Sequence, residues 1–193
     1  MIGLTGPNAS GKGEVAKLLA EAGFALHSLS DVVRESVVER GLEASRDNLI
    51  AVGVRLRVEE GPGVLAARIL PRLKGRAVVD SIRGPAEVAR LRTLPRFILL
   101  GIDAPVKLRF ERAVKRGRLG DGASLDEFIR KEERENSEAE TGQQLRRSLA
   151  LSDRVIRNDG TLDDLRRSVG QALGEIEAAL PSRRPEGDSK PVR

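Results

Sequence analysis

Short apolar runs alternate along the chain with longer stretches of helical periodicity. The apolar runs, which predict strands, are Ile2–Thr5, Phe24–His27, Ala77–Asp80, Phe97–Ile102 and Val155–Ile156. Each run is followed by a stretch that is compatible with a helix, and strands that alternate with helices are typical of βαβ units. The pattern therefore predicts a three-layer α/β fold built on a five-stranded parallel sheet.

Periodic apolar positions and capping patterns locate several helices. One face of the first helix is expected to carry Val15, Leu18, Leu19 and Ala22, and one face of the last helix Leu162, Leu165, Val169, Leu173, Ile176 and Leu180. Thr161 with Asp164 marks the start of that last helix, and two further capping pairs are Ser124 with Glu127 and Thr141 with Gln144. The last two pairs predict helices at about Leu125–Glu135 and Gly142–Leu151.

Two segments interrupt the alternation of strands and helices. Residues 30–73 predict successive helices between the second and third strands, and residues 117–148 are polar, charge-dense and helical between the fourth and fifth. Both are expected to be insertions on the sheet scaffold within one domain of residues 1–180. Residues 181–193 contain three Pro and almost no apolar side chain, which predicts a disordered tail.

Composition narrows the chemistry that the chain can perform. The 193 residues include no Cys and a single His, His27, which excludes disulfides, thiolate chemistry and histidine-rich metal sites. We expect His27 to be structural. Four Phe without Trp or Tyr argue against a base-stacking platform for single-stranded nucleic acid. The start lacks a signal peptide pattern, and the longest aliphatic run is far short of the ~20 residues that span a bilayer. A cytoplasmic location is expected.

The charges are 34 basic and 29 acidic, and the basic residues divide into 27 Arg and 7 Lys. Arginine binds phosphate in a bidentate manner, which would suit a phosphate-handling protein, but a GC-rich genome gives the same bias. No continuous basic run lies outside the short tail, so binding to DNA or RNA ranks last among the functions considered.

A phosphate-binding loop follows the first predicted strand. Residues 6–12 match G-x-x-x-x-G-K between a strand and an amphipathic helix, where backbone N–H groups and the helix dipole favour phosphate. Lys12 is expected to reach the β- and γ-phosphates of ATP. The predicted nucleotide-binding residues of this segment are Gly6, Pro7, Asn8, Ala9, Ser10, Gly11, Lys12, Gly13 and Glu14.

The loop departs from the usual motif directly after its lysine. The Ser or Thr whose hydroxyl ligates Mg²⁺ is replaced by Gly13, which has no side chain. Mg²⁺ must then be held by water, by the nucleotide, or by Glu14 and Asp80. Glu14 could instead stabilise the helix N-terminus, whereas a carboxylate at Asp80, which ends a buried strand, calls for a metal or a network of donors.

Further motifs resemble nucleotide kinases. Gly11-Lys12-Gly13 resembles the loop of adenylate kinases, with Glu14 where that family has Thr. Residues 30–34, with Asp31 and Arg34, resemble the opening of the monophosphate-binding segment, which implies that Arg34 holds the acceptor's phosphate. Residues 78–83 resemble the third strand, which implies that Asp80 lies near Mg²⁺ and that Arg83 binds phosphate, although the spacing is one residue shorter.

The second half of the chain extends this resemblance. Residues 111–116 resemble the hinge into the lid, which implies that residues 117–148 form the lid and that Arg112 and Arg116 contact the base and the phosphates. Residues 152–161 resemble the last strand and turn of dephospho-coenzyme A kinases, which implies that Asn158, Asp159 and Gly160 pack against adenine. Overall, residues 1–180 resemble most an archaeal-type group of P-loop kinases related to both families, with a nucleoside monophosphate kinase-like fold.

Several of these residues also have simpler interpretations. Asp31 could cap the second helix, and Arg34 could be a solvated helix charge. Arg112 and Arg116 share a helix face and could pair with acidic neighbours. Arg130 and Arg134 also share a face, and we expect them to be solvated.

These motifs favour phosphoryl transfer, which depends on positioning and charge neutralisation. The expected catalytic residues are Lys12, Asp31, Arg34, Arg83 and Arg116, with ATP and Mg²⁺ as cofactors and a nucleotide-like small molecule as partner. An acceptor hydroxyl would benefit from Asp31 as a base, whereas an acceptor phosphate needs none. The three-residue step from Asp31 to Arg34 resembles monophosphate kinases and favours that reaction. A dephospho-coenzyme A kinase-type transfer and a regulatory NTPase remain alternatives.

Overall fold

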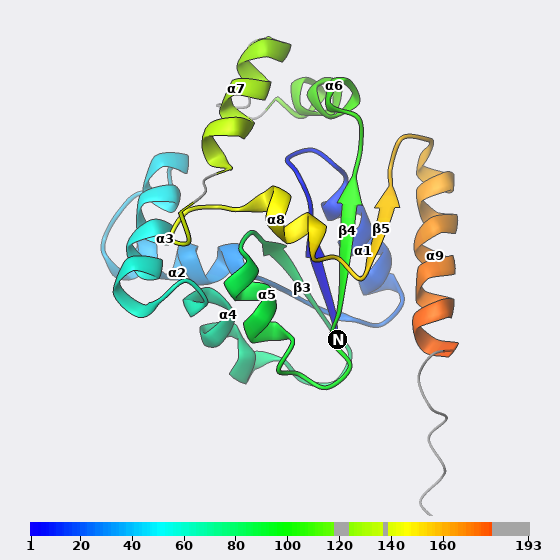
Figure 1. Cartoon of the computed structure of the whole chain (residues 1–193), viewed down its shortest axis with the longest axis horizontal. Helices are drawn as coiled ribbons and strands as arrows, with labels where there is room; N and C mark the ends of the chain where they lie inside the picture. Colours follow the sequence, from blue (N-terminus) through cyan, green and yellow to red (C-terminus); the bar gives the residue numbers. More distant parts are fainter. Residues whose placement is uncertain (118–123, 137–138, 179–193) are drawn as a thin grey trace, which may run out of the picture.

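The sheet at the centre of the molecule has five parallel strands in the order β2-β3-β1-β4-β5. The computed structural model describes residues 1–117, 124–136 and 139–178. The strands are β1 (Ile2–Thr5), β2 (Ala25–Ser28), β3 (Ala77–Ile82), β4 (Ile98–Asp103) and β5 (Arg154–Arg157). All five lie within two residues of the predicted positions, and the predicted α/β fold is confirmed (Figure 1).

Helices cover both faces of the sheet and lie above the carboxyl ends of its strands. They are α1 (Lys12–Glu21), α2 (Leu29–Glu39), α3 (Arg46–Glu60), α4 (Val64–Ile69), the 3₁₀ turn η1 (Leu70–Arg72), α5 (Pro85–Leu91), α6 (Val106–Arg116), α7 (Leu125–Glu135), α8 (Leu145–Ala150) and α9 (Leu162–Ala178). Helices α2 to α4 form the predicted insertion of residues 30–73. Helices α6 and α7 stand above the carboxyl ends of the strands (Figure 1).

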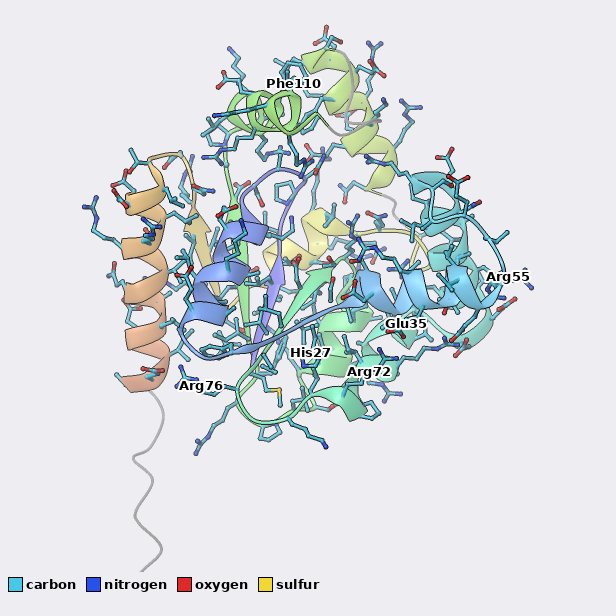
Figure 2. The ribbon with its side chains drawn as sticks, turned by 180° about the vertical axis from the view of Figure 1, so that it is seen from behind. His27, Glu35, Arg55, Arg72, Arg76 and Phe110 are labelled. Atoms are coloured by element: carbon cyan, nitrogen blue, oxygen red, sulfur yellow. The ribbon has the colours of Figure 1, made fainter. Side chains whose placement is uncertain are left out.

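The three central strands, β1, β3 and β4, bury both faces because their side chains alternate between two hydrophobic clusters. Val79 and Leu99 join one cluster with α2 to α5, whereas Val78 and Leu100 join the other with α1 and α9. Strands buried on both faces read as continuous apolar runs, which is why they were visible in the sequence. His27 lies on edge strand β2 opposite Val79, one residue before the carboxyl end of that strand (Figure 2).

The capping predictions succeeded at two helices and failed at one. Ser124 accepts from the Glu127 amide at 3.2 Å, and Thr161 and Asp164 cap each other reciprocally at the start of α9. The prediction for Thr141 was wrong. Helix α8 begins at Leu145, because the preceding Gln144 amide donates instead to the Arg83 carbonyl, at 2.7 Å. The α8 helix packs against α5 and β1, so it belongs to the core rather than to a lid.

Two other expectations also need correction or remain open. Leu162 does not belong to the buried face of α9, because it is the first residue of the helix and is 46% exposed. Leu180 and the predicted tail, residues 181–193, lie outside the described residues. Within the described ranges, no helix combines the length and the apolar character needed to cross a membrane.

A bulge shapes the carboxyl end of β3. Gly3 lies opposite Val79 and Thr5 lies opposite Ile82, so β3 carries one extra residue over this span. Ser81 takes up the irregularity with a left-handed φ of 65°. A bulge bends its strand and redirects side chains, and here it lies between Asp80 and Arg83.

Candidate phosphoryl-transfer site

The loop between β1 and α1 has the backbone of a phosphate cradle. Gly6 and Gly11 have φ angles of 140° and 102°, and Ala9 has 58°. A Cβ on Gly6 would lie 2.1 Å from the Ile102 carbonyl oxygen, and one on Gly11 would lie 2.1 Å from Asn158 Nδ2. Both glycines are therefore required by positive φ and by space, as the motif predicts.

Lys12 is folded back onto this loop. Its Nζ donates to the carbonyl oxygens of Gly6 and Pro7, at 2.8 Å each. Burial, with smaller contributions from Arg83, Arg109 and Arg116, lowers the pKa of Lys12 to about 8, whereas Asp80 opposes the shift. These four side chains are therefore near enough to interact electrostatically with Lys12. Three of the four, Asp80, Arg83 and Arg116, are predicted site residues, and their roles stay predictions.

Asp80 is the residue in this group that fits a magnesium site. Its Oδ1 is buried and has no hydrogen-bond partner in the described part of the chain. A buried carboxylate oxygen without a donor is costly, and a cation would satisfy it. The described residues contain no cluster of three or more His, Asp or Glu that could hold a metal alone, so nucleotide oxygens and water would complete the coordination.

Glu14, the other predicted metal ligand, lies on the exposed side of the first turn of α1. Its Oε1 pairs with Lys17 Nζ at 3.0 Å, and half of its side chain is exposed. This placement matches the simpler interpretation of a first-turn carboxylate that is favourable to the helix dipole. Contact between Glu14 and a metal stays a prediction.

The predicted adenine-binding residues form a clamp that joins α6 to the loop. Arg112 donates to the Asn158 carbonyl at 3.0 Å and to its Oδ1 at 3.3 Å, and Asn158 Nδ2 donates to the Ser10 carbonyl at 2.8 Å. Asp159 and Gly160 follow on the exposed turn before α9. Arg112 thus contacts polar backbone and amide groups rather than the acidic neighbours considered above.

Arg116 and the unpredicted Arg109 bind the other side of the loop. Arg116 Nη2 donates to Asn8 Oδ1 at 3.1 Å. Arg109, almost fully buried, donates to the Asn8 carbonyl at 3.3 Å and forms two bonds, of 2.6 and 2.9 Å, with Glu132 of α7. The sequence signal for Arg109 was its position three residues before Arg112, which places both on one face of α6.

Asp31 and Arg34, which are predicted to act on the acceptor, lie in the first two turns of α2, and Arg83 follows β3. Asp31 and Arg34 form an exposed ion pair at 2.5 Å, and Arg34 also donates to Ser30 Oγ at 3.1 Å. The N-cap of α2 is Ser28, so the interpretation of Asp31 as the cap was wrong. Arg83 reaches from the end of β3 to Gln143 Oε1, at 2.7 Å.

The expected solvated arginines of α7 are confirmed as exposed. Arg130 and Arg134 donate to the carbonyls of Asp126 and Arg130, one turn earlier in their own helix. They lie outside the group of side chains around Lys12.

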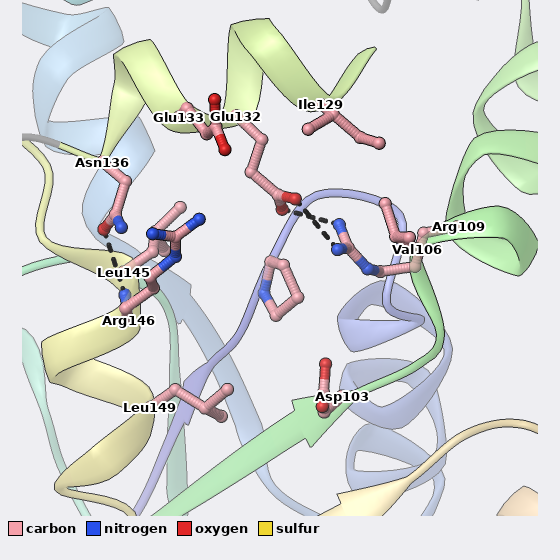
Figure 3. Close-up of a pocket in the computed structure, with 11 residues that line it drawn as sticks. Asp103, Val106, Arg109, Ile129, Glu132, Glu133, Asn136, Leu145, Arg146 and Leu149 are labelled. Carbon is pink, nitrogen blue, oxygen red and sulfur yellow. Dashed lines mark hydrogen bonds and ion pairs between the residues drawn. The ribbon is translucent and has the colours of Figure 1, made fainter. Parts of the chain in front are cut away.

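A cavity of about 320 Å³ lies beside the loop, beneath α7. Figure 3 shows the Arg109–Glu132 pair on its wall, with Leu149 on the core side and Ile129 on the α7 side; Pro7 of the loop also lines it. The ion pair thus joins α6 to α7 at the wall of this cavity.

Comparison with known proteins agrees with this geometry. The family model described as AAA domain matches residues 2–143. The UPF0200 protein PH1008 of Pyrococcus horikoshii is 33% identical over 187 residues, which cover 92% of this chain and 98% of that protein. This chain belongs to the AAA domain and UPF0200 families.

Solved structures similar to this UPF0200 chain have the P-loop kinase fold. The structure of TT1252 from Thermus thermophilus has a TM-score of 0.59 and 24% identity, and covers 90% of this chain and 96% of that one. Shikimate kinase from Bacteroides thetaiotaomicron has the same TM-score with 15% identity, over 91% and 97% of the two chains. At these identities the likeness shows the fold, and function must be argued from the site.

Proposed function

We propose that this UPF0200 chain is an ATP-dependent kinase that phosphorylates a small, nucleotide-like metabolite, in a reaction of the nucleoside monophosphate kinase type. The observation that carries the proposal is that Arg83, Arg109, Arg116 and Asp80 lie within electrostatic range of Lys12 beside a phosphate-binding loop, and that the buried Oδ1 of Asp80 has no hydrogen-bond partner among the described residues. Several cations beside a loop that can hold phosphate are what transfer of a γ-phosphoryl group needs.

Each residue has a distinct task in this proposal. Lys12 would leave the carbonyls of Gly6 and Pro7 to contact the β- and γ-phosphates, and the loop amides would hold the β-phosphate. Arg83 and Arg116 would neutralise the charge that develops on the transferring group. Arg112 and the turn at Asn158, Asp159 and Gly160 would hold the adenine end.

Magnesium and the lid complete the proposed machinery. Asp80 would hold Mg²⁺ or its bound water, with Glu14 as a further predicted ligand, and the ion would neutralise phosphate oxygens when bound. Arg109 links the loop to α7 through Glu132, so closure of α7 over the nucleotide would exclude water and suppress hydrolysis.

The acceptor side assigns different tasks to Arg34 and Asp31. Arg34 would bind the acceptor's phosphate, after exchanging its partner Asp31 for the substrate. An acceptor phosphate is already a nucleophile. If the acceptor were instead a hydroxyl, as in a dephospho-coenzyme A kinase-type transfer, Asp31 would accept its proton.

The proposal is tested by ADP formation from ATP and Mg²⁺ with separate acceptors. Nucleoside monophosphates and dephospho-coenzyme A test the two proposed reaction types, and shikimate tests the reaction named for the structural neighbour. Lys12→Ala should abolish turnover, whereas Lys17→Ala, a change of the same type on the exposed side of α1, should leave it intact. ADP release at one slow rate with or without every acceptor would contradict a kinase and favour a regulatory NTPase.

A further inference from the structure

A buried ion pair connects the helical insertion to the strand end that bears Arg83. Arg57 of α3 donates from Nη2 to Glu87 Oε1 of α5 at 2.8 Å, and the two side chains are 7% and 0% exposed. Arg57 Nη1 also donates to the Gly53 carbonyl, at 3.2 Å. No step of the proposed transfer uses this pair directly.

The second oxygen of Glu87 holds the backbone from which Arg83 projects. Oε2 accepts from the Arg83 amide at 2.8 Å and from the Gly84 amide at 3.1 Å. One carboxylate therefore receives a guanidinium on one oxygen and two consecutive backbone amides on the other. This fixes the turn between β3 and α5 relative to α3.

Arg83 connects this turn to the segment before α8 and to the phosphate-binding loop. Its guanidinium bonds to Gln143 Oε1 at 2.7 Å, and its carbonyl accepts from the Gln144 amide at 2.7 Å. The same guanidinium is close enough to lower the pKa of Lys12. The turn is thus the junction of the insertion, the segment before α8 and the phosphate-binding loop.

Stability alone does not account for such a pair. Removing two charges from water costs several kcal/mol per ion, and well-packed apolar residues of similar size are often as stable or more stable. The pair fixes the orientation of the Glu87 carboxylate, since each of its oxygens accepts hydrogen bonds from defined partners. A misplacement of about 1 Å in a group that contacts the substrate can lower a rate by about 100-fold.

We propose that Glu87 is a positioning residue: its oxygen that faces the turn sets the placement of Arg83 at the transferring phosphoryl group and thereby the rate of transfer. The inference rests on the proposed kinase function and deepens it, because it adds a buried residue of α5 to the apparatus that orients Arg83. Glu87 itself touches neither substrate.

The test uses Glu87→Gln, which keeps the shape of the side chain but leaves a single acceptor oxygen. With Arg57 present, that oxygen is expected to face the guanidinium, which turns the amide NH₂ toward the Arg83 and Gly84 amides and displaces the turn. We expect kcat for the best acceptor of the panel above to fall at least tenfold, with the ATP Kd within twofold of wild type. In Arg57→Met/Glu87→Gln, the oxygen is free to face the turn, and most of kcat should return.

The matched control is Val88→Ala, which removes buried volume from the next residue of α5 without touching the turn. Assays are run well below every variant's Tm, so a purely structural effect would leave kcat unchanged in both variants. Equal kcat in Glu87→Gln and Val88→Ala, or no recovery in the double variant, would overturn the positioning role and leave the kinase proposal standing. A wild-type chain without acceptor-dependent turnover would overturn both. If Glu87→Gln fails to fold, the double variant decides, because the proposal requires it to retain most of wild-type kcat.

Discussion

The buried Lys12 ammonium lowers the stability of the ligand-free protein, and the Lys12→Met variant measures by how much. Burial lowers the pKa of its ammonium from 10.5 to about 8. At about 1.4 kcal/mol for each tenfold change in proton affinity, this corresponds to about 3 kcal/mol against the charged form below pH 8. Methionine has similar length and no charge, so the variant escapes this penalty.

The loss of two hydrogen bonds to the Gly6 and Pro7 carbonyls offsets part of the gain. We therefore expect the free energy of unfolding of Lys12→Met, from urea denaturation at pH 7, to lie between the wild-type value and about 3 kcal/mol above it. Most substitutions of buried residues destabilise by about 1 kcal/mol instead. ATP binding, measured by calorimetry, should be lost in the same variant.

The pH dependence of the free energy of unfolding tests the same prediction independently. Below pH 8 the ammonium is charged in the folded and unfolded states, and the penalty is complete. Between about pH 8 and 10.5 the unfolded state binds more protons, so this group makes wild-type stability rise with pH. The gap between Lys12→Met and wild type should therefore close across that window. If Lys12→Met is less stable than wild type by more than 1 kcal/mol at pH 7, or if the difference in stability does not change with pH, then burial of the Lys12 charge does not destabilise the protein.

Three further substitutions test separate parts of the site. Asp80→Asn should make ATP affinity, measured by calorimetry, independent of Mg²⁺; an unchanged Mg²⁺ dependence would exclude Asp80 from the metal site. Glu132→Gln should lower the free energy of unfolding, measured by urea titration, by about 3 kcal/mol because it leaves the buried Arg109 charge without its carboxylate. The control is Glu35→Gln, which breaks an exposed ion pair with Arg72 (Figure 2) and should cost less than about 1 kcal/mol. Equal losses in the two variants would contradict this prediction. Asn158→Ala should weaken ATP binding about tenfold by releasing the clamp on the loop, and an unchanged Kd would remove the clamp from the nucleotide site.

The strands, the loop and most helices could be predicted because local patterns encode them. Buried parallel strands read as apolar runs, and a loop that needs positive φ at Gly6 and Gly11 has to show its glycines. Helix ends were predicted where the cap is local, as at Thr161. They were missed at Gln144, where the deciding hydrogen bond reaches Arg83 across the fold.

The buried ion pairs of Arg109 and Glu87 could not be predicted from the sequence for a related reason. Each is a charged residue on a short helix, and by composition such residues are solvated. Their burial depends on partners 23 and 30 residues away, Glu132 and Arg57, which no local pattern reveals. The bulge at Ser81 was hidden as well, because it arises from the register between β1 and β3.

The most direct test of the account follows the labelled phosphoryl group of [γ-³²P]ATP in single-turnover reactions with Mg²⁺ and each acceptor. We expect that, with one acceptor of the nucleotide-like class, label passes to that acceptor faster than to water, and that Lys12→Ala abolishes the transfer. Label released only as inorganic phosphate with every acceptor would contradict the kinase assignment.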